Sequence, residues 1–441
     1  MTQTVLNFTV ESTDERLTPR AGQIVFGEYL KAIGLEKLCN AHLPQPKSNR
    51  GYRPFGFIQP LIHMFHSGGK SLEDIRTIAS DKALREILNI PKVPTADSTG
   101  KWLKRHGLGG IYGIEKVNQK LLGRYLGRIN EPLILDIDAT IIESHKSTAE
   151  NTYKQFPGFS PMIGHVNGGY VVHSEFRSGN IAPADHNLSF VKRCIAQLPK
   201  DKRLSYLRAD SASYQHALFD YCEANHITYT IGARLDNRVL EGIDEITQWE
   251  PIQETKGKDH HLKEEVAEFW HTMHKSQHAF RLIVVKKSIT PMLPGIWEML
   301  SEEEKLALAR ERYSVIATNA DPDTMPAKEI VQFYRKRGDT SENRIKELKS
   351  GFNIHHLPSS DFISNAFYFQ IGILAYNLFM LFKETLQHNW QRHTIQTIRY
   401  KLYHIAGKVI RHARRLVLKV NDEFVEILHA IRQKSYEISL E

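Results

Sequence analysis

Apolar residues recur at helical spacing through most of the first 128 residues. The clearest stretches are 24–38, 55–65, 72–88 and 111–126, and none of this part alternates as a β-strand does. A segment rich in helix-capping residues, 94–99, precedes a helix that carries Lys101, Lys104 and Arg105. Two short helices around such a joint are typical of a helix-turn-helix, and the alternative is a small helical bundle with a basic outer face. We expect residues 1–128 to form an all-α DNA-binding domain whose basic helix contacts DNA.

The pattern changes abruptly at Glu131-Pro132. Residues 133–139 form a buried-strand pattern, and 164–172 form a hairpin pattern around an Asn-Gly-Gly turn. A helix at 187–198, a strand at 204–209, a helix at 214–225 and a strand at 227–233 follow. A strand meander followed by alternating helix and strand predicts an α/β fold with a ribonuclease-H-like mixed sheet, whose first part spans residues 129–234.

Strand signals continue between residues 235 and 322, notably at 279–285 and 313–317, and we interpret this part as a β-rich insertion. Helices resume after Met325-Pro326, and residues 323–385 are expected to complete the core. The apolar stretch 362–382 is long enough to cross a bilayer. Its four polar residues, Ser364, Asn365, Gln370 and Asn377, would each need a partner in lipid, so we expect a buried core helix.

Positive charge is concentrated near the C-terminus of a chain with 58 Lys and Arg, 50 Asp and Glu and a formal charge of +8. No acidic residue occurs between Glu384 and Asp422, whereas Lys or Arg occupies positions 392, 399, 401, 408, 411, 414, 415 and 419. A solvated helix face usually mixes both signs, so this segment favours a polyanionic partner. We expect residues 386–441 to be a helical basic region in which Arg411, Arg414 and Arg415 contact DNA.

Several other classes of protein are disfavoured. The three cysteines, Cys39, Cys194 and Cys222, are too far apart for a disulfide framework or a cysteine zinc site, and the N-terminus lacks the pattern of a secretory signal. Residues 68–71 resemble part of a phosphate-binding loop, but Met64 stands where its first glycine should be. We therefore expect a cytoplasmic protein that uses no nucleotide cofactor and no membrane.

Two aspartates share one face of the strand at 133–139. Asp136 and Asp138 are two residues apart, so both carboxylates point to the same side. Buried side by side they would require a cation, and a hard divalent metal is the commonest one; the alternative is a solvated strand end. A third carboxylate, Asp210, follows the strand at 204–209 and could either bind the same metal or cap the next helix.

A fourth carboxylate lies among cations in the stretch 334–349. On a helix, Glu342, Lys346 and Lys349 share one face, with Arg337 nearby. A solvated, salt-bridged face would give the same pattern. The combination with the strand aspartates favours a carboxylate site that faces a phosphate backbone.

In three motifs the sequence resembles the DDE transposases of bacterial insertion sequences. The motifs are Asp-Ile-Asp-Ala-Thr at 136–140, Leu-Arg-Ala-Asp-Ser at 207–211 and the stretch 337–349. The resemblance covers most of the chain, and it implies that Asp138, Asp210 and Glu342 are the catalytic, metal-binding acids, with Asp136 the competing choice for the first. Tyr334, Arg337 and Lys349 match the family's Tyr-Arg-Glu-Lys motif, which grips phosphates near the transposon end.

One spacing departs from that motif. The family places three residues between Arg and Glu, whereas four lie between Arg337 and Glu342; the six residues between Glu342 and Lys349 agree. Lys346, on the same predicted face, is a further DNA-binding candidate.

The resemblance further implies an enzyme that binds terminal inverted repeats, cleaves DNA at the element ends and joins the 3′-hydroxyl ends to target DNA. It implies Mg²⁺ as cofactor, with Mn²⁺ as a substitute, and a homodimer on DNA. The alternatives are a ribonuclease-H-like nuclease without strand transfer and a non-catalytic DNA-binding protein with structural carboxylates.

Overall fold

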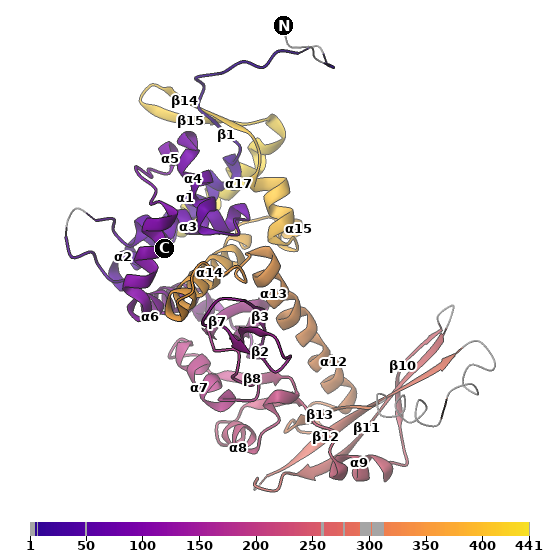
Figure 1. Cartoon of the computed structure of the whole chain (residues 1–441). Coiled ribbons are helices and arrows are strands. Elements are labelled where there is room, and N and C mark those ends of the chain that lie inside the picture. Colours follow the sequence, from indigo (N-terminus) through magenta and orange to yellow (C-terminus); the bar gives the residue numbers. More distant parts are fainter. Residues whose placement is uncertain are drawn as a thin grey trace. The chain divides into compact units, whose positions relative to one another are not determined.

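The computed structural model describes residues 5–6, 8–48, 51–256, 260–276, 278–291, 301 and 313–440. The chain divides into two compact units. The first combines residues 1–117 with 347–441, and the second is the continuous segment 118–346. In the first unit, helices from the two ends of the chain lie together, drawn in purple and in orange to yellow (Figure 1).

Helices dominate the first unit, as the apolar spacing predicts. They are α1 (Ala21–Ala32), α2 (Leu35–His42), α3 (Phe55–Ser67), α4 (Arg76–Ser80), α5 (Lys82–Ile87), α6 (Ala96–Arg128), α14 (Phe362–Lys383), α15 (His388–Gln391), α16 (Ile395–Ile398) and α17 (Asp422–Ser439). Gly34, at φ 71°, separates α1 from α2 in a left-handed conformation that glycine adopts without strain. Helix α6 is kinked at Gly107 and continues into the second unit.

The apolar helix α14 is a buried core helix, as expected. Its length and composition would also suit a membrane span, but 94% of its most apolar window is buried. The polar groups at its start have protein partners: Asp361 accepts a hydrogen bond from the Ser364 backbone N–H at 2.7 Å, and Asn365 donates to the Ser359 carbonyl at 2.8 Å. Aromatic contacts such as Phe26 with Phe382, at 5.2 Å between ring centroids, tie the helix to its neighbours.

The expectation of a wholly helical C-terminal region is wrong. Residues Gly407–His412 (β14) and Arg415–Lys419 (β15) form an antiparallel hairpin, and β1 (Leu17–Thr18) pairs with β14 to complete a three-stranded sheet. The N-terminal region is therefore not all-α either. Residues 408–412 (Lys-Val-Ile-Arg-His) and 415–419 (Arg-Leu-Val-Leu-Lys) place apolar residues side by side instead of at every second position, so the period of two that marks a half-buried strand is not visible in this segment.

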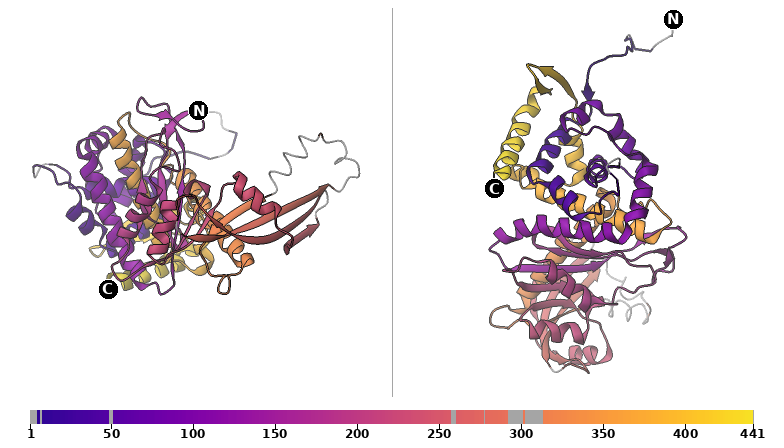
Figure 2. Two further views of the ribbon diagram at one scale, coloured as in Figure 1. Left: turned by 90° about the horizontal axis from the view of Figure 1, so that it is seen from below. Right: turned by 90° about the vertical axis from the view of Figure 1, so that its left-hand side faces the viewer.

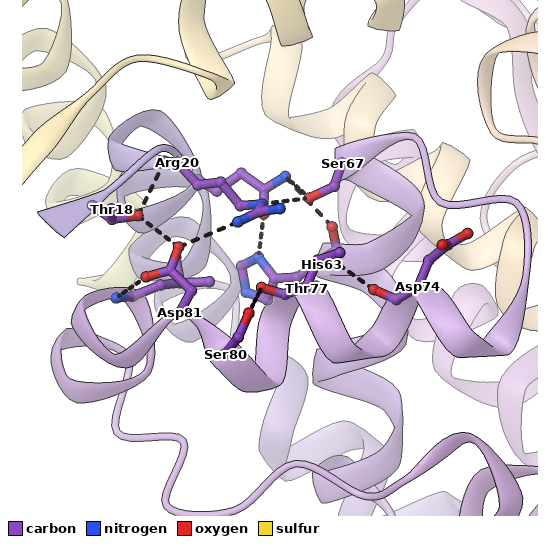
Figure 3. Close-up of polar contacts among 10 residues, drawn as sticks. Thr18, Arg20, His63, Ser67, Asp74, Thr77, Ser80 and Asp81 are labelled. Atoms are coloured by element: carbon purple, nitrogen blue, oxygen red, sulfur yellow. Dashed lines mark hydrogen bonds and ion pairs between the residues drawn. The ribbon is translucent and has the colours of Figure 1, made fainter. Parts of the chain in front are cut away.

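A polar network holds β1 against the helices of the first unit (Figure 3). The buried carboxylate of Asp81 accepts hydrogen bonds from the Thr18 hydroxyl at 2.7 Å and the Leu84 backbone N–H at 3.0 Å. Arg20 approaches the same carboxylate at 3.4 Å, and its Nε donates to the Ser67 hydroxyl at 3.3 Å. Because Thr18 lies on β1, Asp81 fixes this strand to the start of α5.

A nine-stranded mixed sheet forms the second unit. Its strands are β2 (Leu133–Ala139), β6 (Met162–Val166), β7 (Tyr170–Glu175), β8 (Leu204–Ala209), β9 (Thr228–Gly232), β10 (Glu250–Lys256), β11 (His260–Thr272), β12 (Ala279–Pro291) and β13 (Tyr313–Thr318). Their order is β10-β11-β12-β13-β9-β8-β2-β6-β7. Strands β2, β8 and β9 are parallel neighbours, and the other pairs are antiparallel. The expected strands at 133–139, 204–209, 227–233 and 279–285 are thus confirmed.

Four helices belong to the same unit as this sheet (Figure 2). They are α7 (Asn187–Gln197), α8 (His216–Ala224), α9 (Asn237–Asp244) and α12 (Ala327–Arg337). The approach of α7 to β6 requires a glycine, because a Cβ at Gly164 would lie 2.6 Å from the Cys194 sulfur. Helix α12 packs on β8, β9, β11 and β12. Its C-terminal end leads directly to the stretch that carries Glu342. A second, small sheet of β3 (Ile142–Glu143), β5 (Pro157–Phe159) and β4 (Glu150–Asn151) lies in the loop after β2.

Candidate functional site

The parallel pairing of β2 and β8 brings two of the predicted acids together. Ile137 on β2 pairs with Ala209 on β8, so Asp138 and Asp210 each follow at the same end of adjacent strands. Glu342 ends a π-helical segment, Gly338–Glu342, that continues α12 and packs on β2. Three elements that are distant in sequence therefore meet at the C-terminal ends of strands β2 and β8.

Arg337, at the end of α12, lies between two of these carboxylates. Its Nη2 is 3.0 Å from Oδ2 of Asp138, and its Nη1 is 3.6 Å from Oε1 of Glu342. The Arg337 side chain is only 8% exposed, whereas that of Glu342 is 66% exposed. Arg337 thus connects a partly buried acid with a solvent-facing one.

Negative charge accumulates around Asp138. Burial raises the pKa of this carboxyl to about 6; Arg337 opposes the rise, and the carboxylates of Asp210 and Glu342 add to it. Such a group carries its charge at neutral pH at a cost in free energy, and a further cation would relieve that cost.

The three carboxylates supply hard oxygen donors of the kind that Mg²⁺ and Mn²⁺ prefer. Among the described residues, however, no three His, Cys, Asp or Glu side chains are already arranged to hold a metal ion. Arg337 stands between Asp138 and Glu342, and Asp210 accepts a hydrogen bond from the Ala212 backbone N–H at 3.1 Å. The donor set fits a divalent cation, and binding would require these side chains to turn toward a common point.

Asp136 has a different environment from Asp138. Its two oxygens accept hydrogen bonds from Nε and Nη2 of Arg208, both at 2.7 Å, and both side chains are at most 4% exposed. Arg208 also donates to the Phe333 carbonyl at 2.7 Å and stacks over that ring at 4.7 Å. The compensating cation for Asp136 is therefore an arginine.

Arg208 is a site residue that the sequence did not reveal, although it lies within the motif Leu-Arg-Ala-Asp-Ser at 207–211. The available signal was an arginine within an apolar strand, two residues before Asp210. Only the register of the parallel pair, in which Asp136 stands opposite Arg208, reveals the partnership.

The unusual spacing between Arg337 and Glu342 coincides with the π-helical segment. In a π-turn the hydrogen bond runs from residue i to i+5, so one extra residue is accommodated without breaking the helix. The five-residue step from Arg337 to Glu342 crosses this segment, and the two side chains still meet. The extra residue is therefore absorbed locally.

The helix beyond Glu342 is not a regular α-helix. A short α-helical segment, α13 (Asn343–Lys346), is followed by a second π-helical segment, Glu347–Gly351, that contains Lys349. The expected single face of Glu342, Lys346 and Lys349 assumed α-helical spacing throughout, and this assumption is wrong at Lys349. Lys346 is exposed on the second unit, and Lys349 belongs to the first.

Tyr334 lies beside Asp210 in a cavity of about 430 Å³ whose lining also includes Gly232, Lys287 and Tyr313. A Cβ at Gly232 would lie 2.9 Å from the Tyr334 hydroxyl and 3.1 Å from the Ser211 backbone nitrogen. A glycine at the end of β9 therefore permits the close approach of α12 to the Asp210 loop.

The remaining predicted DNA-binding residues lie on the surface of the first unit. Lys101, Lys104 and Arg105 are exposed on α6, and Lys101 pairs with Asp97 at 2.8 Å. Arg411 pairs with Glu86 at 3.0 Å on the hairpin. Arg414 and Arg415 are exposed and form no ion pair with the described residues.

Comparison with known families agrees with this arrangement. A family model described as "Transposase DDE domain group 1" matches residues 3–434, nearly the whole chain. A search among curated proteins found no match. DDE transposase domains act on DNA and generally use divalent metal ions. The mixed α/β architecture is consistent with such a domain. The chain therefore belongs to the DDE transposase family.

Proposed function

We propose that the protein is an insertion-sequence transposase. It would bind the terminal inverted repeats of its element, cleave the DNA at the ends and transfer the 3′-hydroxyl ends to target DNA. The observation that carries this proposal is the convergence of Asp138, Asp210 and Glu342, from three separate elements, around one buried arginine. Membership of the DDE transposase family supports it.

The order of strands supports a ribonuclease-H-like core. From β7 through β6, β2 and β8 to β9, two antiparallel pairings are followed by two parallel ones, which matches a meander with alternating helix and strand. We propose residues 129–234 and 323–346 as this core, with the strands of 235–322 as an insertion. Residues 347–385, expected from the sequence to complete the core, belong to the first unit. Residues 1–128 and the basic region 386–441 would bind DNA.

Asp138, Asp210 and Glu342 would hold the divalent cation, Mg²⁺ or its substitute Mn²⁺. When bound, such a cation stabilises the charge that develops on the oxygens of a phosphoryl group during in-line displacement. Asp138 is ionised at neutral pH, because burial raises its pKa only to about 6. Asp136 would keep β2 and β8 in register through Arg208 and would not bind the metal.

Arg337 would exchange partners when DNA arrives. Its guanidinium offers several donors in a planar fork that suits phosphate as well as carboxylate. We infer that Arg337 releases Glu342 and grips a phosphate near the scissile one, assisted by Tyr334, Lys346 and Lys349. Two subunits would act together on the two element ends, in the cytoplasm.

One observation favours a non-catalytic alternative. Arg337 already neutralises part of the acidic cluster, as a purely structural ion pair would. A DNA-binding protein with structural carboxylates predicts that removing an acid weakens folding. A transposase predicts that it removes chemistry.

The test is a reaction of the purified full-length protein with a donor plasmid that carries both element ends and with a target plasmid, in Mg²⁺. We expect cleaved ends and joined products from the wild type. Asp138→Asn, Asp210→Asn and Glu342→Gln should form neither, while they keep their affinity for end DNA. Cleavage without joining would indicate the nuclease alternative, and wild-type cutting by any of the three variants would remove that residue from the site.

A further inference from the structure

The β14–β15 hairpin, residues 407–419 and hereafter the basic hairpin, has two unlike faces. On the inner face Val409 is paired with Leu418, and Val409 is 3% exposed. A Cβ at Gly407 would lie 2.7 Å from the Cβ of Ala21, so this face is pressed against α1. The inner face therefore belongs to the core of the first unit.

The anchoring continues through the third strand of this small sheet. β1 pairs with β14 at Leu17 and Thr18, and Thr18 is held by the buried carboxylate of Asp81 (Figure 3). At the other end of β14, Arg411 pairs with Glu86 on α5. The basic hairpin is thus a fixed part of its unit.

The outer face carries like charges directly opposite one another. The two cations Lys408 and Lys419 are paired, and Arg415 is paired with the imidazole of His412. Like charges at opposed positions of a β-ladder repel and destabilise the pair. Lys408 forms an ion pair with Glu15. Arg415 and Lys419 are exposed and form no ion pair within the part of the chain that the structure describes. This arrangement favours a polyanionic partner on the outer face.

The turn of the hairpin places an arginine at its tip. Ala413 and Arg414 connect the paired residues His412 and Arg415, and both have positive φ, 48° and 67°. A two-residue turn of this kind favours Asn-Gly, because other residues are strained at positive φ. The turn instead carries a small alanine and an exposed arginine without an ion pair to the described residues.

We propose that the basic hairpin is a DNA-binding wing whose tip inserts Arg414 into the minor groove while Arg415 and Lys419 lie against phosphates. The minor groove is only about 6 Å wide, so it admits a side chain at a tight tip and excludes the full ribbon. The inner face packs on α1, so the tip and the outer face are the parts of the basic hairpin that can contact DNA. Arginine in a narrow minor groove favours A·T-rich DNA.

This inference rests on the proposed function, since it assumes that DNA is the partner. It goes further by naming the groove and the residue that enters it. Arg411 is not among the proposed DNA contacts of the basic hairpin, because it forms an ion pair with Glu86.

The experiment measures the affinity of the full-length protein for three 30-bp duplexes by fluorescence anisotropy over a range of salt. The duplexes differ in a central tract of A·T, G·C or inosine·C pairs. Inosine·C presents the minor groove of A·T and the major groove of G·C, so it separates the two readouts. The wild type should bind the inosine·C duplex as tightly as the A·T duplex and the G·C duplex about tenfold more weakly.

Arg414→Gly removes the tip side chain and keeps a residue that tolerates positive φ, so the hairpin should still fold. This variant should lose most of the preference for A·T. Joint replacement of Arg415 and Lys419 by alanine should flatten the slope of log affinity against log salt by about 2, with the preference retained. Lys37→Ala, an exposed cation on α2, is the matched control and should change neither quantity.

Inosine·C binding that resembles G·C binding, or an Arg414→Gly variant with wild-type preference, would overturn minor-groove insertion. An unchanged salt slope in the double variant would overturn the phosphate contacts. Both results leave the proposed function standing, because the wild type would still bind DNA. Wild-type protein that binds no duplex at any salt would instead reject the proposed function together with the wing.

Discussion

Asp136 and Asp138 should respond in opposite ways to the same substitution. The two residues share a strand and a face, but Asp136 meets Arg208 through two hydrogen bonds of 2.7 Å, both within the interior. Asp136→Asn leaves the Arg208 guanidinium buried without its counter-charge. Breaking one partner of a buried pair costs about 3–5 kcal/mol.

Asp138→Asn replaces the carboxylate with a neutral amide of the same shape, and burial at this position favours the neutral form of the carboxyl over the charged one. The rise of its pKa from 3.8 to about 6 corresponds to about 3 kcal/mol of unfavourable free energy for the charged form at neutral pH. The asparagine variant should therefore be as stable as the wild type or more stable, by up to about 3 kcal/mol, although the Arg337 contact weakens. The contrast between the two variants is larger than either change alone.

Urea unfolding of the metal-free, full-length proteins at pH 7.5 measures this contrast, with tryptophan fluorescence and circular dichroism as probes. Asp136→Asn should unfold at clearly lower urea than the wild type, and Asp138→Asn at equal or higher urea. The reverse order would refute the division into a structural and a catalytic aspartate. Equal destabilisation by both would mean that Asp138 is structural too.

Three further outcomes follow from individual contacts. Because the folded pKa of Asp138 is raised, its stabilising contribution is present at low pH and is lost as pH rises from 3.8 to about 6. Across this window the metal-free wild type should therefore lose up to about 3 kcal/mol of stability relative to Asp138→Asn, as measured by unfolding both proteins at each pH. Gly22→Ala should lower stability by at least about 2 kcal/mol in the same assay, because the new Cβ would lie 1.8 Å from the Leu402 carbonyl oxygen. Gly123→Ala, in α6 with nothing within 4 Å of the new Cβ, should instead raise stability by about 0.5–1 kcal/mol.

The sequence predicted the elements of the sheet well, because each had a local signal. The apolar run at 133–139 and the Asn-Gly-Gly turn specify their strands through neighbouring residues alone, and β2, β6 and β7 follow them. The basic hairpin was missed, since charges on the outer face of a two-stranded ribbon resemble charges on a helix. Only the pairing of β1, almost 400 residues earlier, completes that sheet.

The candidate site was predictable in its residue types and not in its pairings. The carboxylates could be recognised from motifs, but the neutralisation of Asp136 depends on the register between β2 and β8. The contact of Arg337 with Glu342 depends on a π-helical turn that no spacing rule for α-helices anticipates. Long-range register and local departures from regular helix are the information that a single sequence does not display.

The central claim, that Asp138, Asp210 and Glu342 jointly hold the metal, is tested most directly by changing the metal preference of each position. Asp138→Cys, Asp210→Cys and Glu342→Cys replace a hard oxygen with a soft sulfur, which binds Mg²⁺ poorly and Mn²⁺ better. DNA cleavage at the element ends is then measured in each metal, with Asp136→Cys as the control. We expect the three variants to be inactive in Mg²⁺ and partly restored in Mn²⁺, and the control to gain nothing from the exchange. Wild-type cleavage in Mg²⁺ by any of the three, or restoration of the Asp136 variant instead, would contradict the assignment.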